Sequence, residues 1–338
     1  MKYINLSEFQ VGRKQQAGVM SVYPLFAEDV KTPLAKFEDI KFHGTSGYGT
    51  MVFTNRSEHP FILPTGYAII TKQLAQDHAL PFASLLAPES KRHIHEACCI
   101  QQTQGGYIDG SKVKSFFILP LYIRKKHFEQ TVFPRGKNPL WKSPIDFARL
   151  WKHISDFQSK LVKRNEGNLV LFFNKFMEQL TQFNAEFEVL DGQRGAVVLL
   201  NDKIVGIEVA PTHEYWKTVW NSLIRDCYGS EVIRLTMQNL IEEFQASQEL
   251  AVDFSGCDSI EAIESAIEKH YQKGIQDLKE RLEDIGRLET IEVDASKDII
   301  RNNSFGNIAY HIVKAKDADI YGEVYCDKDS MIYCSLLF

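Results

Sequence analysis

A β-hairpin at residues 194–209 (RGAVVLLNDKIVGIEV) constrains the fold of this chain more than any other segment. Two runs rich in β-branched residues flank Asn201 and Asp202. Both of these residues tolerate the positive φ that a tight hairpin turn requires. The pattern therefore predicts two antiparallel strands here, and we expect other segments to join them in a sheet.

Short strands are predicted in the first part of the chain and again at its end. The first part carries apolar runs separated by turn-forming residues, of which the NRSEHP cluster is the clearest. Pro120 lies inside one of these runs, where proline favours a sheet edge or a bend. The predicted strand segments are residues 17–26, 49–55, 61–63, 91–100 and 116–123, and three runs within 306–338.

Helical periodicity dominates the middle of the chain. Ser143 followed by Pro144 is typical of a helix start, and Thr212 is a further capping residue. Asp258 and Glu261 resemble a capping box that opens a long helix with one apolar and one charged face. The predicted helices are residues 143–161, 168–190, 212–227, 230–248 and 258–286.

This order of elements predicts an α+β fold. A β-rich N-terminal part is followed by a helical middle with one strong hairpin, and a β-rich C-terminus completes the sheet system. Length alone allows about two domains. Because the terminal strands are expected to complete one sheet system, we predict a single domain over residues 1–338, with sub-parts at 1–142 and 143–338.

Charge and composition exclude several classes of partner. The formal net charge of -5 argues against a broad electrostatic contact with nucleic acid or with an anionic membrane. No apolar run approaches the ~20 residues that cross a bilayer, and the N-terminus lacks the apolar core of a signal peptide. Six cysteines without a C-x-x-C pair are too few for a disulfide scaffold. We therefore expect a cytoplasmic protein with reduced thiols.

A candidate binding site lies in residues 61–107, where two apolar runs each end in polar groups. The first run ends at Lys72 and Gln73, after Gly66, and the second at Gln101. Lysine offers a compact positive charge for phosphate, and glutamine offers a donor and an acceptor. The alternative is that these residues are ordinary strand ends and a turn. The second run continues with Gln102, Gln104, Gly105, Gly106 and Tyr107.

Metal binding and nucleophilic catalysis are weakly supported by the local motifs. His93 and His95 would share one face of a strand with Cys99, but no second ligand cluster appears elsewhere. We therefore predict no metal site. The chain has no G-x-S-x-G elbow, no P-loop and no dinucleotide fingerprint, so we expect no bound cofactor. No catalytic residue is predicted with certainty from these motifs, and His95 and Glu96 are the weak acid-base candidates.

Several motifs together resemble one known family. They are VYPLF at 22–26, VFTNRSEHPFILPTGYAIITKQ at 52–73, HEACCIQQTQGGY at 95–107, LWKHISDFQ at 150–158, the hairpin and helix at 195–228, and MIYCSLLF at the end. In this order they are similar to the ARPP domain family, the ADP-ribosylglycohydrolase and rhodanese-phosphatase-superfamily associated proteins. The resemblance covers almost the whole chain.

The resemblance implies a ligand of the ADP-ribose or nucleotide kind and a setting in NAD metabolism and bacterial antiviral conflict systems. Tyr67, Ala68, Leu74 and Ala75 stand where family members typically carry glutamates and Asn-Arg, which implies binding without turnover. The residues that carry over from the family pattern are Gly66, Lys72, Gln73, Cys99, Gln104, Gly105 and Tyr107.

Three hypotheses follow from the sequence and the resemblance. The first is an ADP-ribose or nucleotide binder, in which Lys72 contacts phosphate and Tyr107 stacks on a base or packs in the core. The second is a non-catalytic sensor or adaptor that binds a protein partner through the helical middle and the helix at 258–286. The third is an enzyme acting on a nucleotide or ADP-ribosyl group through Glu96 and His95.

Overall fold

The structure is a computed structural model, and most of the chain can be described in it. The predicted hairpin is confirmed: β13 (Gln193–Leu200) and β14 (Lys203–Val209) join through Asn201 and Asp202, whose φ angles are 52° and 59°. The described residues are 4–46, 49–70, 77–102, 115–132, 147–162, 167–238, 252, 254–287, 297–315, 319–328 and 330–338.

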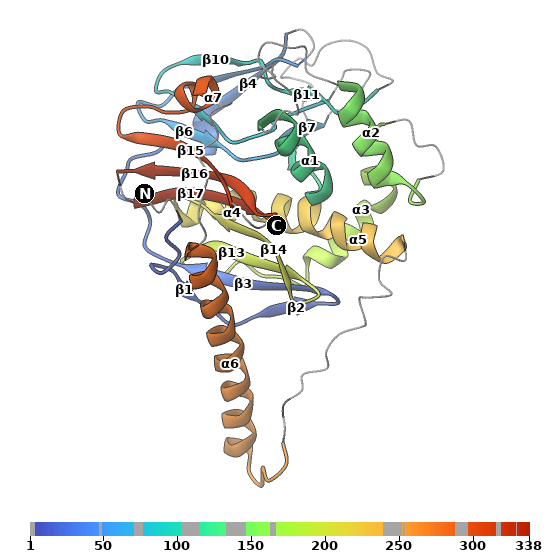
Figure 1. Ribbon diagram of the computed structural model, residues 1–338, viewed down its shortest axis with the longest axis vertical. Coiled ribbons are helices and arrows are strands. Elements are labelled where there is room, and N and C mark those ends of the chain that lie inside the picture. Colours follow the sequence, from blue (N-terminus) through green and yellow to red (C-terminus); the bar gives the residue numbers. More distant parts are fainter. Residues whose placement is uncertain are drawn as a thin grey trace.

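An eight-stranded antiparallel sheet forms the base of the molecule (Figure 1). Its strand order is β1-β3-β13-β14-β17-β16-β15, and β2 pairs with β3. The C-terminal strands therefore complete a sheet that the N-terminal strands begin, as the sequence predicted. The strands are β1 Gln10–Val11, β2 Gln15–Ala17, β3 Met20–Phe26, β13 Gln193–Leu200, β14 Lys203–Val209, β15 Ile308–Lys314, β16 Tyr321–Asp327 and β17 Ser330–Leu337.

Three smaller sheets lie above the large one and come from residues 40–118 (Figure 1). Their strand orders are β10-β5-β4, β11-β8-β7-β12 and β6-β9. The strands are β4 Ile40–Thr45, β5 Met51–Asn55, β6 Phe61–Leu63, β7 Tyr67–Ile70, β8 His78–Ala79, β9 Ser84–Leu86, β10 Lys91–Ile94, β11 Cys98–Cys99 and β12 Ser115–Ile118.

Two predicted strands are shorter in the structure than in the sequence pattern. Residues 91–100 do not form one strand, because the chain turns at His95 and Glu96 and β10 and β11 belong to different sheets. Residues 116–123 are a strand only as far as Ile118. Pro120 then precedes helix α1 (Leu121–Val132), since proline lacks the N–H that a continuing strand would need but fits the start of a helix.

The helices lie in the middle of the chain, as predicted, and the fold class is α+β. A π-helical segment, η4, joins α4 to α5. Thr212 caps α4 by accepting a hydrogen bond from the Tyr215 N–H at 3.1 Å. The helices are η1 Phe37–Asp39, α1 Leu121–Val132, α2 Phe147–Gln158, α3 Val170–Asn184, α4 His213–Asn221, η4 Ser222–Gly229, α5 Ser230–Met237, α6 Ile260–Arg287 and α7 Lys297–Asn302.

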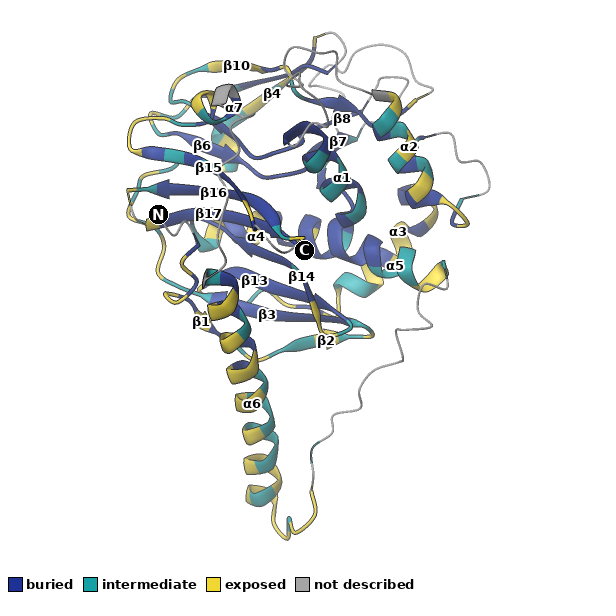
Figure 2. Cartoon of the chain, viewed as in Figure 1, coloured by how far each residue is buried: buried dark blue, intermediate teal, exposed yellow. Residues whose placement is uncertain are grey.

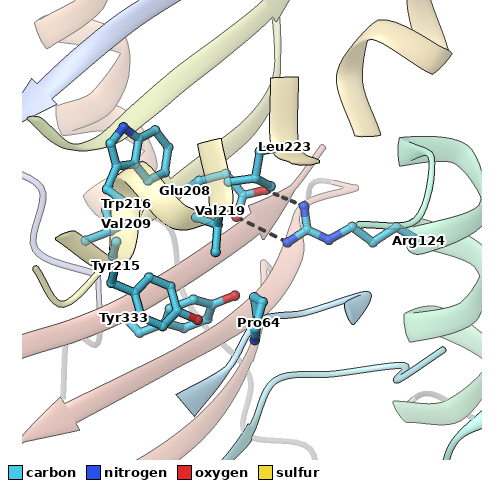
Figure 3. A pocket seen from close by; sticks show the side chains of 10 residues that line it. Pro64, Arg124, Glu208, Val209, Tyr215, Trp216, Val219, Leu223 and Tyr333 are labelled. Carbon is cyan, nitrogen blue, oxygen red and sulfur yellow. Dashed lines mark hydrogen bonds and ion pairs between the residues drawn. The ribbon is translucent and has the colours of Figure 1, made fainter. Parts of the chain in front are cut away.

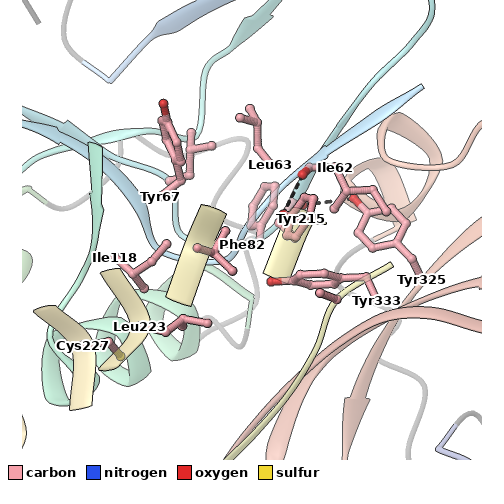
Figure 4. Packing of buried hydrophobic residues seen from close by; sticks show 14 of the residues in the cluster. Ile62, Leu63, Tyr67, Phe82, Ile118, Tyr215, Leu223, Cys227, Tyr325 and Tyr333 are labelled. Carbon is pink, nitrogen blue, oxygen red and sulfur yellow. Dashed lines mark hydrogen bonds between the residues drawn. The ribbon is translucent and has the colours of Figure 1, made fainter. Parts of the chain in front are cut away.

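Both faces of the large sheet are covered by other elements of the chain (Figure 2). The inner face packs against the small sheets and α4, in a cluster that includes Phe82, Tyr215 and Tyr333 (Figure 4). The outer face packs against the N-terminal segment and the C-terminal half of α6, through Ile275 and Leu278 among others. Helices α1, α2 and α3 form a third apolar cluster with β7 and β12.

Two further properties bear on the sequence predictions. All six cysteines are free thiols, and Cys257 is the only one that is not buried. None of the helices in the described ranges is both long enough and apolar enough to cross a membrane.

Candidate functional site

The four-stranded sheet β11-β8-β7-β12 brings distant parts of the predicted site together at one end of its strands. Its strands are antiparallel, with Ser115 opposite Ile70, His78 opposite Ile69, and Cys99 opposite His78. The chain therefore leaves this edge after residues 70 and 102, and it re-enters the sheet at residues 77 and 115. This side of the sheet is formed by the ends of its strands and includes Asp77, His78, Cys99 and Gln101. We call it the polar edge.

Asp77 and Gln101 form a fully buried polar pair at the polar edge. Neither side chain is exposed, and the Gln101 Nε2 group donates a hydrogen bond to Oδ2 of Asp77. A backbone hydrogen bond joins the same two segments: the Ile100 N–H donates to the Asp77 carbonyl at 2.9 Å. The Gln101 Oε1 atom is buried and has no hydrogen-bond partner among the residues that the structure describes. An unsatisfied buried acceptor costs about 1–3 kcal/mol, so a donor at this atom would be stabilising.

Cys99 and His78 are held in place by backbone contacts at the same edge. The Cys99 thiol donates to the Gln101 carbonyl at 3.0 Å, and the Trp151 indole N–H donates to the Cys99 carbonyl at 3.0 Å. Burial raises the pKa of the Cys99 thiol to about 12, so the thiol is protonated at neutral pH. His78 accepts a hydrogen bond from the Gly49 N–H at 3.3 Å. Cys99 is therefore a buried, hydrogen-bonded thiol with a raised pKa.

Several predicted ligand-binding residues lie outside the described residues. These are Lys72, Gln73, Gln104, Gly105, Gly106 and Tyr107. The residues on either side of them are placed at the polar edge by the strand pairing of Ile70 with Ser115. Of the predicted ligand-binding residues, Gln101 is the one that the structure places there.

Gly66 lies at the opposite end of β7 from Ile70, about 13 Å away at the usual strand rise. Its φ is +72°, and a Cβ at this position would lie 3.1 Å from Cγ of Arg124. The structure therefore separates Gly66 from Gln101. The conformation of Gly66 and its lack of a side chain give the Arg124 side chain room.

The metal and acid-base candidates do not converge with Cys99. The rings of His93 and His95 stack with centroids 6.2 Å apart, and both residues are exposed. His95 shares a hydrogen bond with the Thr50 hydroxyl at 3.2 Å, while Cys99 is fully buried in another sheet. Among the described residues, no group of three or more His, Cys, Asp or Glu side chains could hold a metal ion. Glu96 is partly exposed beside His95.

A second polar cluster, which the sequence analysis missed, lies inside the core (Figure 3). Arg124 on α1 pairs with Glu208 on β14 through two contacts of 2.5 and 3.2 Å, and it also donates to the Ser335 hydroxyl at 2.8 Å. The Tyr228 hydroxyl, on the π-helical segment, donates to Glu208 at 2.7 Å. These groups are almost completely buried. The hollow beside them has room for about one water molecule, so it is not a ligand cavity.

Glu323 extends this cluster across the sheet. Glu208, Ser335 and Glu323 are paired on adjacent strands and therefore point to the same side. The Glu323 carboxylate accepts the Ala83 N–H at 2.9 Å and the Tyr310 hydroxyl at 2.5 Å. Burial raises the pKa of the Glu323 carboxyl to about 7. Single glutamates inside apolar strands, as in GIEVA and YGEVY, were the sequence signal for these residues.

Comparisons with known proteins agree with the resemblance drawn from the motifs. Residues 8–295 match the family model ARPP-1, described as the ARG and Rhodanese-Phosphatase-superfamily-associated Protein domain. Searches of curated proteins and of solved structures found no match. Because the matched residues make up most of the 338-residue chain, the chain belongs to the ARPP-1 family.

Proposed function

We propose that this protein binds a nucleotide of the ADP-ribose kind at the polar edge. The observation that supports the proposal is the buried Asp77–Gln101 pair, whose Gln101 Oε1 atom has no hydrogen-bond partner in the described part of the chain. Ile70 and Ser115, which border the predicted ligand-binding segments, are paired in the same sheet. An amide oxygen and a carboxylate suit the hydroxyl groups of ribose and the amino group of adenine.

The family membership supports the choice of ligand. The family description associates this domain with ARG and with the rhodanese-phosphatase superfamily. In the resemblance drawn from the motifs, ARG stands for ADP-ribosylglycohydrolase. We propose that Lys72 contacts a phosphate, that Gln73 and Gln104 hydrogen-bond the base or ribose, and that Gly105 and Gly106 let the backbone approach the ligand. The setting in a bacterial conflict system linked to NAD metabolism is part of the same proposal.

Calorimetric titration of the purified protein with ADP-ribose and with NAD tests the proposal. The substitutions Lys72→Ala and Gln101→Leu should each weaken binding at least tenfold. Lys279→Ala, on the exposed face of α6, and Gln130→Leu are the matched controls. Gln130 is a buried glutamine of α1 whose Oε1 atom likewise has no partner within the described ranges. No binding by the wild-type chain, or equal affinities for Gln101→Leu and Gln130→Leu, would remove the polar edge as the site.

Mass spectrometry of small molecules released from freshly denatured protein identifies the ligand independently of any chosen probe. An adenine nucleotide at near-stoichiometric amount is the expected result. A ligand without a base or ribose would contradict the role given to Gln101.

A sensor or adaptor that acts through protein contacts is the second candidate function. It is favoured by a different observation, at the other end of the molecule. Of the six large hydrophobic residues that are exposed in the described ranges, Phe254, Ile260 and Ile263 lie within ten residues of one another, at and just before the start of α6.

A further inference from the structure

The small sheet β10-β5-β4 has an exposed face that is rich in basic side chains. Its two outer strands lie at the top of the molecule, and exposed residues occupy much of both (Figure 2). Lys41 and Lys91 both pair with Thr54 on the central strand, so these three side chains point to the same side of the sheet. None of the three strands contains an acidic residue. We call this surface the basic face, and its exposed basic residues are Lys41, His43, Arg56, Lys91, His93 and His95.

The positive charges of the basic face lie close together. Lys41 and Lys91 flank one strand, which places their backbones about 10 Å apart at the usual spacing between strands. Burial, followed by the positive charges of its neighbours, lowers the pKa of His43. Those neighbours are Lys41, Lys91 and Arg56, so the three cations surround one imidazole ring.

Carboxylates border the basic face without covering it. Glu89 and Glu96 lie two residues before and two residues after β10. No ion pair joins the basic face to a carboxylate among the residues that the structure describes. Lys152, an exposed lysine of α2, is by contrast paired with Asp156 at 2.7 Å. The positive charges of the basic face are therefore available to an anionic ligand.

Three imidazole rings lie among these charges, and threonine hydroxyls hold two of them in place. The His43 Nε2 atom lies 2.8 Å from the Thr54 Oγ1 atom, and the His95 Nδ1 atom lies 3.2 Å from the Thr50 Oγ1 atom. The rings of His93 and His95 are nearly parallel, with 22° between their planes and 6.2 Å between their centroids. A ring that is already held loses little conformational entropy when a flat partner stacks on it.

We propose that the basic face binds a single-stranded nucleic acid, with phosphates on Lys41, Arg56 and Lys91 and bases against the imidazole rings. Proteins that bind single strands combine a positively charged surface with aromatic rings, histidine among them, on which the bases stack. A polyphosphate would use the charges of the basic face but not its rings. The formal net charge of -5 argues against a broad contact, and this contact is limited to one three-stranded sheet. The inference does not depend on the nucleotide proposal.

Fluorescence anisotropy of the full-length chain with a labelled oligouridylate of about twelve nucleotides tests this binding. The titrations are made at pH 8, where lysine and arginine carry the positive charge. Each phosphate neutralised on a single strand contributes about 0.7 to the dependence of log K on log salt, so three cations should give a slope of about -2. Lys41→Ala and Lys91→Ala should each weaken binding about fivefold at ~0.1 M salt and reduce the slope by about 0.7.

A histidine variant separates base stacking from charge. His93→Ala should weaken binding at least about fivefold and leave the salt slope unchanged, because it removes a stacking ring and no phosphate contact. Lys279→Ala and His270→Ala, both on α6, are the matched controls and should bind as the wild type does. Lys41, Lys91 and His93 are exposed, so their substitution should leave the fold intact, which circular dichroism checks.

Binding of the oligouridylate or of an oligothymidylate of the same length supports the proposal, and the tighter of the two identifies RNA or DNA as the ligand. Binding of neither, or equal affinities for Lys91→Ala and Lys279→Ala, would overturn it. Wild-type affinity in His93→Ala would show a contact with any polyanion and would also overturn it. Calorimetric titration of Lys91→Ala with ADP-ribose should match the wild type, and Gln101→Leu should keep oligonucleotide binding, so the two proposals fail separately.

Discussion

At the scale of single residues, the core cluster depends on a glycine that the sequence pattern does not single out. A Cβ on Gly206 would lie 1.9 Å from the hydroxyl oxygen of Tyr228. This is the hydroxyl that donates to Glu208. The absence of a side chain at position 206 therefore lets Tyr228 reach the carboxylate.

Replacing Gly206 should destabilise the fold through this contact. We expect Gly206→Ala to lower the free energy of unfolding by about 1–3 kcal/mol, the usual cost of overpacking a core. Urea denaturation measures the change. Gly286→Ala is the control, because a Cβ there would meet nothing closer than 3.6 Å and lies in a helix that favours alanine. Equal stability of the two variants would contradict the steric role of Gly206.

His127 makes stability depend on pH. Burial, with a smaller contribution from His153, lowers the pKa of His127 from 6.5 to about 3, and neither ring nitrogen has a hydrogen-bond partner in the described structure. Below about pH 6.5 the unfolded chain binds a proton at this residue and the folded chain does not. The folded state is then destabilised as pH falls, by roughly 2 kcal/mol between pH 7 and pH 5.

Urea denaturation at pH 7 and pH 5 checks this dependence. The variant His127→Leu should lose about 2 kcal/mol less than the wild type over this interval. His93→Leu, at an exposed position, should retain the wild-type difference. A wild-type pH dependence in His127→Leu would show that other groups are responsible.

At the scale of secondary-structure elements, the Arg124–Glu208 pair joins α1 to β14 inside the core. Both side chains are less than one-tenth exposed, so the ions interact at low dielectric. Removing one partner leaves a buried charge, which costs more than removing both. The pair therefore fixes the position of α1 on the sheet.

A double-mutant cycle should show this coupling. Arg124→Met should lower the free energy of unfolding by about 3–5 kcal/mol, and the double variant Arg124→Met, Glu208→Leu by less than the sum of the two single changes. Urea denaturation of the four proteins gives the coupling energy. Additive single effects would mean that the pair does not act as a unit.

At the scale of the whole molecule, the large sheet depends on strands that lie beyond the matched family segment. The match ends at residue 295, whereas β17 pairs with β14 and carries Tyr333 and Ser335 into the core. Without β15, β16 and β17, β14 would become an exposed sheet edge, and Glu208 would lose its neighbours Ser335 and Glu323.

A chain that ends at residue 295 should therefore not fold. We expect it to be insoluble, or to lack near-ultraviolet circular dichroism and a cooperative urea transition. The full-length chain is the reference. A truncated chain with a cooperative transition would show that the terminal strands are an addition to a self-sufficient fold.

The sequence by itself determined the local structure, because local structure follows from short-range rules. Turn residues at 201 and 202 predicted the hairpin, the Thr212 cap predicted α4, and the apolar spacing from Ile260 to Ile285 predicted α6. The predicted strand at 91–100 was too long, because alternation does not show where a chain crosses from one sheet to another. The α+β class followed from the order of these segments, and the family from motifs that resemble it.

Only the tertiary structure decided which side chains meet. Asp77 and Gln101 are 24 positions apart, and Arg124 and Glu208 are 84 apart, so their contacts depend on strand register and helix packing. The same is true of Gly66, which the family pattern placed in the binding site and which the fold places against Arg124. Contacts between distant residues depend on the closure of long loops around one core, and no short-range pattern in the sequence contains that information.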